Sequence, residues 1–146
     1  MTTLQWMNVR AGRTVDTSDI DPAHYVNGEP PICIARARHG GHLLPGYVRL
    51  TNHVGYFADR REVVKKTEYQ LLLDGSVAWQ EVGEGEPVPE NAVKIGSTCQ
   101  ETLYLGAANV NGEDLLGTVA SSVCSIAIDD RVFETRTFSI LVRMTS

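Results

Sequence analysis

The chain has 146 residues, a formal net charge of −5 and a pI near 5.3. This acidic balance argues against a nucleic-acid partner, because such a protein needs a basic face to neutralise phosphates. No segment is apolar and long enough to span a membrane, and three cysteines without a CxxC pair indicate neither a disulfide framework nor a zinc site.

The first residues of the sequence lack the apolar run of a signal peptide, and no N-x-Ser/Thr sequon is present. We therefore expect a cytoplasmic protein, with vesicle association or non-classical release as alternatives. No motif in the sequence indicates a cofactor, and we expect none.

Short apolar segments separated by turn residues follow one another along the chain, in a pattern typical of strands. Residues 4–9 carry Trp6, and residues 31–48 predict strand, turn and strand, with turns at Gly40-Gly41 and Pro45-Gly46. Asn27-Gly28 predicts a further tight turn. The first half of the chain thus predicts an antiparallel β structure.

Alternating apolar residues predict further strands at 47–50 and 54–57. The spacing in residues 61–73 also fits a helix. Its counterpart at 131–142 is rich in Val, Phe, Thr and Ile, so we predict strands in both segments.

The strand, turn and strand of residues 31–48 occur a second time at residues 103–119. Gly46 and Gly117 are matched positions 71 residues apart. The W-x-x-V-x-x-G-x-x-V pattern that starts at Trp6 returns 73 residues later at Trp79. The sequence therefore predicts two copies of one unit, residues 1–75 and 76–146.

A β unit of about 70 residues would be marginally stable alone, because it buries too little apolar surface. We therefore expect an all-β fold in which two tandem pseudo-symmetric antiparallel units, with exchanged strands, form one compact domain.

Several residues could carry chemistry, and each has a simpler structural explanation. His39 and His42 could hold a metal, but no acidic or thiol ligand lies at a fixed spacing, so polar turn residues are the simpler hypothesis. Cys99 would act as a nucleophile only with an imidazole from the other unit. We therefore expect neither a metal site nor an enzyme.

Two further groups allow a binding role. The basic residues Arg60, Arg61, Lys65 and Lys66 could bind an anion, although a solvated strand face is the simpler hypothesis. Trp6 and Trp79 could stack on sugars, but their matched positions favour core anchors.

The W-x-x-V-x-x-G pattern, the segment PICIARARHGGHLLPGYV and the later TEYQLLL resemble the DM9 (DM-nine) repeat family of insects and molluscs. The resemblance extends from Trp6 to Val142. It implies an all-β fold of tandem units that exchange strands. For some members it also implies lectin-like recognition of mannose in innate immunity.

The resemblance also implies where a sugar would be clamped between a carboxylate and a lysine. The carboxylate position falls at Val26 or Asn27 and, in the second unit, around Ser97 or Thr98. The lysine position falls at Tyr47 and, in the second unit, at Thr118. The charged pair is therefore replaced in this chain. A Gly-Lys-Glu segment of the family survives in part as residues 59–62.

We expect two pseudo-equivalent shallow sugar sites near the turn after His24, the Pro45-Gly46 turn and residues 59–62. The residues expected to contact ligand are Asn27, Arg36, His42, Tyr47 and Glu62 in the first unit, and Thr98, Glu113 and Thr118 in the second.

These features predict a non-enzymatic carbohydrate-binding protein of insect innate immunity that recognises mannose-type glycans on pathogens. One shallow sugar site binds with only about millimolar affinity, so we expect a homodimer or a higher oligomer. The alternative is a cytosolic scaffold for protein interactions that has kept the fold and lost sugar binding.

Overall fold

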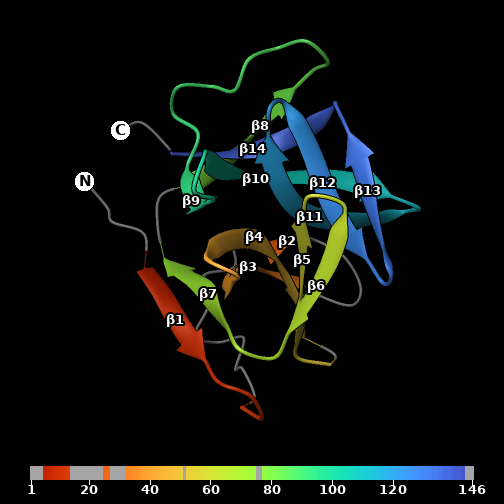
Figure 1. Ribbon diagram of the computed structural model, residues 1–146. Helices are drawn as coiled ribbons and strands as arrows, with labels where there is room; N and C mark the ends of the chain where they lie inside the picture. Colours follow the sequence, from red (N-terminus) through yellow and green to blue (C-terminus); the bar gives the residue numbers. More distant parts are fainter. Residues whose placement is uncertain (1–4, 14–24, 27–31, 51, 75–76, 144–146) are drawn as a thin grey trace.

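The computed structural model describes residues 5–13, 25–26, 32–50, 52–74 and 77–143 (Figure 1). Within these ranges the chain is all-β and antiparallel, without a helix, so the all-β part of the predicted fold is confirmed. None of the described residues forms a helix able to cross a membrane.

The described residues hold fourteen strands. They are β1 (Gln5–Val9), β2 (Tyr25–Val26), β3 (Ile32–His39), β4 (His42–Arg49), β5 (Val54–Asp59), β6 (Glu62–Lys66), β7 (Tyr69–Asp74), β8 (Val77–Val82), β9 (Lys94–Ser97), β10 (Thr102–Val110), β11 (Glu113–Ala120), β12 (Val123–Ile128), β13 (Arg131–Thr135) and β14 (Phe138–Arg143). The segments 61–73 and 131–142 are strands, as predicted.

The same pattern of strand pairing occurs in β1–β7 and in β8–β14. In the first set β1 pairs with β7, β7 with β3, and β3, β4, β5 and β6 pair in succession. In the second set β8 pairs with β14, β14 with β10, and β10 to β13 pair in succession. The two sets occupy the lower and upper parts of Figure 1.

The expected exchange of whole strands between units is not seen in the described ladders. Each ladder joins strands of one set, except where Leu43 of β4 pairs with Ser97 of β9. This pairing joins all fourteen strands into one hydrogen-bonded sheet.

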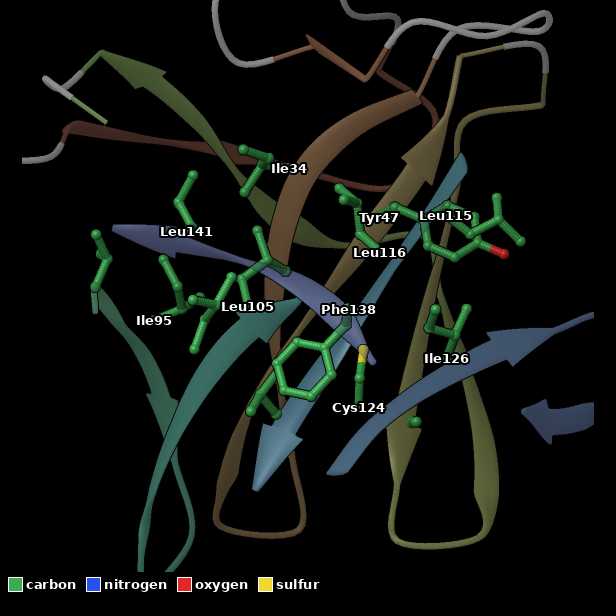
Figure 2. Close-up of a cluster of buried hydrophobic side chains, with 14 of the residues drawn as sticks. Ile34, Tyr47, Ile95, Leu105, Leu115, Leu116, Cys124, Ile126, Phe138 and Leu141 are labelled. Atoms are coloured by element: carbon green, nitrogen blue, oxygen red, sulfur yellow. The ribbon is translucent and has the colours of Figure 1, made fainter. Parts of the chain in front are cut away.

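Side-chain packing, in place of exchange, holds the two sets together. Strands β4 and β5 pack against β11 and β12. Buried side chains of both sets form one apolar cluster, in which Tyr47 of the first set lies beside Leu115 of the second (Figure 2). Each set therefore completes the core of the other.

The expected turn at Pro45-Gly46 is wrong, because both residues lie inside β4. At this point β4 ends its pairing with β9 and begins its pairing with β5 at Gly46. A proline fits a strand where no ladder hydrogen bond requires its nitrogen. Gly40-Gly41 does form the turn between β3 and β4, and Asn27-Gly28 lies outside the described residues.

Gly46 and Gly117 are needed because two strands approach closely. A Cβ at Gly46 would lie 2.3 Å from the carbonyl oxygen of Tyr56, and one at Gly117 would lie 2.1 Å from that of Ser125. Real Cβ atoms essentially never come so near a backbone oxygen. The matched glycines thus permit the same contact in both sets.

Two side-chain hydroxyls, one from each set, donate hydrogen bonds across the contact between the sets. The Tyr47 hydroxyl donates to the carbonyl of Ala127 at 2.6 Å. Thr118, which is matched to Tyr47, donates toward the carbonyls of Pro45 at 3.2 Å and Ala58 at 3.4 Å. Because Ala58 and Ala127 are also matched positions, the two bonds are related by the pseudo-symmetry.

An ion pair at the edge of the same contact joins Arg49 to Glu113, with distances of 2.8 Å and 3.2 Å to the two carboxylate oxygens. The hydrogen bond from Arg49 lowers the pKa of Glu113. The Arg49 guanidinium also lies over the rings of Tyr47 and Tyr56. This pair adds a pH-dependent link between the sets.

We predict that Gly117→Ala lowers the free energy of unfolding by more than about 3 kcal/mol, because the strands must separate to admit the methyl group. Urea denaturation measures this loss. Gly85→Ala is the control. Gly85 has a positive φ of +84°, but a Cβ added there would meet open space. This substitution should lower the free energy of unfolding by only about 1–2 kcal/mol. Equal losses in both variants would contradict the close-approach explanation.

We predict that Tyr47→Phe and Thr118→Val each cost about 1–2 kcal/mol of unfolding free energy, because each leaves a buried carbonyl without its side-chain donor. Thermal and urea unfolding measure the loss against Tyr104→Phe, a half-buried tyrosine of β10. A loss no larger than that of Tyr104→Phe would show that the reciprocal bonds add nothing to stability.

We predict that Glu113→Gln makes unfolding less dependent on pH. The lowered pKa of Glu113 means that its stabilising effect is present above the unfolded pKa of about 4.3 and is lost as pH falls through the folded pKa. The carboxylate is partly exposed, so the difference at pH 7 should be about 0.5 kcal/mol. The urea midpoints of the wild type and of Glu113→Gln should differ at pH 7 and coincide at pH 3. A difference that persists at pH 3 would exclude the ion pair as its cause.

Candidate binding site

A groove of about 730 Å³ lies on the first set of strands. We call it the first groove, and it is lined by residues 8–10, 36–38, 43 and 65–70. These residues come from β1, β3, β4, β6 and β7 and from the turns that follow β1 and β6. The ladders of this set thus bring together residues that are far apart in the sequence.

Three polar side chains form a row across neighbouring strands in the first groove. Gln70 of β7 is paired with Asn8 of β1 on one side and with Arg36 of β3 on the other. Its amide nitrogen donates to Asn8 Oδ1 at 2.8 Å, and its amide oxygen accepts from Arg36 Nε at 2.7 Å. The row presents amide and guanidinium groups in a fixed arrangement.

Arg36 is held on three sides. Its guanidinium lies over the Trp6 ring at 4.0 Å, and Nη1 donates to the carbonyl of Ile95 at 3.1 Å. Burial, and in second place the nearby charge of Arg38, lowers the pKa of Arg36. One face of the Trp6 ring is therefore covered by Arg36, and Trp6 itself packs against the core, as Trp79 does.

A second groove of about 520 Å³ lies at the matching place on β8–β14. It is lined by residues 81–83, 86, 107–109, 133, 135 and 137–139. Offsets of 73, 71 and 69 positions relate most of these residues to those of the first groove. The pairing of Ser139 with Glu81 and with Ala107 repeats the row at Gln70.

Where a cation of the first groove has a matched position in the second groove, that position holds an uncharged residue. Arg10, Arg36, Arg38 and Lys66 of the first groove correspond to Gly83, Ala107, Asn109 and Thr135 of the second. The first groove contains one carboxylate, Glu68, among its cations, whereas the second contains Glu81 and Glu86 and no basic residue. Matched backbones therefore carry positive charge in one groove and negative charge in the other.

Lys65 also lines the first groove, but its ammonium group makes contacts outside the groove. Its Nζ lies 3.5 Å from Asp130 and over the ring of Tyr56. Arg61 lines a third hollow, with Glu84 and Arg136, so the basic cluster expected from the sequence is divided.

Among the residues expected to contact ligand, Arg36 alone lines the first groove. His42, at the start of β4, places Nδ1 3.3 Å from Asp59 Oδ1. Glu62 is exposed at the start of β6, on the turn that follows Asp59. Asn27 lies outside the described residues.

In the second set, the expected contacts are separated from one another. Glu113 pairs with Arg49. The Thr98 hydroxyl accepts from the backbone nitrogens of Gln100 and Glu101, which closes the turn after β9. The pairing of Leu43 with Ser97 brings this turn toward the start of β4. None of these contacts lines the second groove.

Tyr47 and Thr118 do not fit the expected role as ligand contacts. Tyr47 is 0% exposed and Thr118 is 7% exposed, and both hydroxyls are used between the sets. Burial raises the pKa of Tyr47. The positions that the resemblance assigns to a sugar-clamping lysine are thus part of the core in this chain.

The cysteines and histidines do not form a reactive centre among the described residues. Cys33 and Cys124 are buried, and burial raises the pKa of each thiol to about 12. Cys99 is exposed. Within the described ranges no group of three potential metal ligands gathers around one point.

Sequence reasoning missed the residues that make the first groove distinctive: Asn8, Arg10, Arg38, Glu68 and Gln70. A signal was present, because Arg36 and Arg38 alternate on one strand while the second copy has Ala107 and Asn109 there. Comparing the two copies for lost charges, as well as for shared apolar residues, would have found it.

Residues 27–143 match the DM9 repeat family. No curated protein is similar enough in sequence to count as a match. The fold is similar to that of the nematode sperm cell motility protein MFP2B, whose crystal structure gives a TM-score of 0.67 at 11% sequence identity.

That similarity covers 100% of this chain and 46% of MFP2B, so the chain spans less than half the length of MFP2B. At this identity the likeness concerns the fold alone. The family match, in contrast, extends over most of the chain and confirms the resemblance found in the sequence. The chain belongs to the DM9 repeat family.

Proposed function

We propose that this protein is a non-enzymatic carbohydrate-binding protein, and that its first groove holds the glycan. The observation that carries the proposal is the combination of groups there: one carboxylate, Glu68, among the amides of Asn8 and Gln70 and the cations of Arg38 and Lys66. A carboxylate can accept from neighbouring sugar hydroxyls, while amides and cations donate to others.

The size and wall of the first groove suit a small saccharide. Its volume of about 730 Å³ lies within the range of ligand pockets. The Asn8, Gln70 and Arg36 row is already hydrogen-bonded, so these groups are held in place before a ligand arrives. Such preorganisation reduces the entropy lost on binding.

Mannose-type glycans are the first ligands to consider, because the sugar-recognising members that the sequence resembles bind mannose. The clamp would differ from theirs, since Tyr47 and Thr118 are buried at the former lysine positions. Glu68 and Lys66 supply the two kinds of charge at another place in the same unit.

The biological role that we propose is recognition of glycans on pathogens, in insect innate immunity, by a cytoplasmic protein. One groove of this kind would bind with a Kd of about 1 mM. Useful avidity would therefore need several grooves at once, which favours a dimer or higher oligomer. Residues 1–75 and 76–146 would be its two DM9 units.

A second candidate function is a scaffold for protein interactions that has lost sugar binding. The likeness of the fold to that of MFP2B, a nematode sperm cell motility protein, is compatible with it. The burial of Tyr47 and Thr118 is also compatible with a lost sugar clamp.

We predict saturable binding of mannobiose or another glycan of a small panel, measured by titration calorimetry and by NMR shifts. Glu68→Ala should weaken this binding at least about fivefold, because it removes a charged acceptor. Glu81→Ala, a carboxylate of the second groove, is the matched control and should leave it unchanged.

Flat titrations with every glycan at tens of millimolar would contradict sugar binding and leave the scaffold as the better proposal. Equal weakening by Glu68→Ala and Glu81→Ala would show that the first groove is not the site.

A further inference from the structure

The two grooves can be compared within one molecule, because matched strands carry different side chains in each. From this comparison we infer that the first groove selects glycans that bear anionic groups, such as phosphate, sulfate or uronate. The inference rests on the proposed function and names the ligand class of the same groove.

Most cations of the first groove make no ion pair, among the described residues, that would give them a structural role. Among the described residues, no carboxylate lies within ion-pair distance of Arg10, Arg38 or Lys66. Arg38 is exposed and Lys66 half-buried at the groove wall. In a chain with a net charge of −5, a concentration of unpaired cations in one hollow provides a local positive field.

Arg36 adds a further positive charge to the first groove, and its contacts hold that charge in place. Its guanidinium is fixed by Trp6, Gln70 and Ile95, and it lies close enough to Arg38 for their like charges to repel. A bound anionic group would offset this repulsion. Arginine is well suited to such a contact, because its fork of donors matches phosphate and carboxylate oxygens.

The matched positions of the second groove show that the fold does not need these charges. The same strands form a groove there with glycine, alanine, asparagine and threonine in place of the four cations. Glu81 and Glu86 would repel an anion in that groove. Anion selection should therefore be confined to one side of the pseudo-symmetric molecule.

A saccharide fits the first groove better than other anionic partners do. The aromatic residue that lines the groove, Tyr69, is 5% exposed and offers no platform for stacking a nucleic-acid base. The acidic chain as a whole opposes a flat anionic surface such as a membrane. The amides of Asn8 and Gln70 add the neutral hydrogen bonds that sugar hydroxyls use.

The test compares mannose with mannose 6-phosphate, with inorganic phosphate as the free anion, by NMR titration of the whole chain at about 0.15 M salt. Mannose 6-phosphate should bind about tenfold more tightly than mannose, since charge-assisted hydrogen bonds are added. Arg38→Gln with Lys66→Gln should reduce its affinity to that of mannose. Arg136→Gln with Arg143→Gln, exposed arginines of the second set, removes the same charge elsewhere and should have no effect.

The outcomes separate this inference from the proposed function. Equal affinity for mannose and mannose 6-phosphate would overturn anion selection while leaving sugar binding intact. Inorganic phosphate binding as tightly as mannose 6-phosphate, or tighter binding of RNA or of vesicles with anionic lipid, would overturn the choice of a glycan. Absence of binding by every sugar would overturn the proposed function and the inference together. Circular dichroism and thermal unfolding confirm that each variant is folded.

Discussion

The structure depends on the burial of β4 and β5 against β11 and β12. Each set buries part of its apolar surface against the other, since residues such as Tyr47 and Leu115 belong to one shared cluster. Glycines at 46 and 117 let β4 approach β5, and β11 approach β12, closely within each set. The reciprocal bonds of Tyr47 and Thr118 then fix how the two sets meet.

Much of the fold could be predicted because a repeat reveals itself in sequence. Matching Gly46 with Gly117 and Trp6 with Trp79 aligned strands that do have equivalent pairings in the structure. The turn predicted at Gly46 is wrong, since a sequence does not distinguish a glycine of a turn from one required by a close approach of two strands. Tyr47 was misplaced for a similar reason: its partner, Ala127, lies in the other unit, and no local pattern indicates that contact.

The candidate site was harder to predict than the fold. Its residues come from separate strands, and only the ladders β1–β7 and β3–β7 place Asn8, Gln70 and Arg36 in one row. The family resemblance implies a sugar site at other positions, Tyr47 and Thr118 among them. Here those positions lie in the core, while positive charge lies in one groove and is absent from its counterpart. The two sets thus differ in surface chemistry while they share the same strand pairing.

The bond from Tyr47 to Ala127 joins residues 80 positions apart in the chain. Contacts of such long range are formed late and slowly, because a long loop must close before they are made. During synthesis the first seven strands would emerge with Tyr47 and its neighbours uncovered until β11 and β12 follow. The shared core therefore makes the nascent first half dependent on the second, and exposes it to aggregation or chaperone capture in the interval.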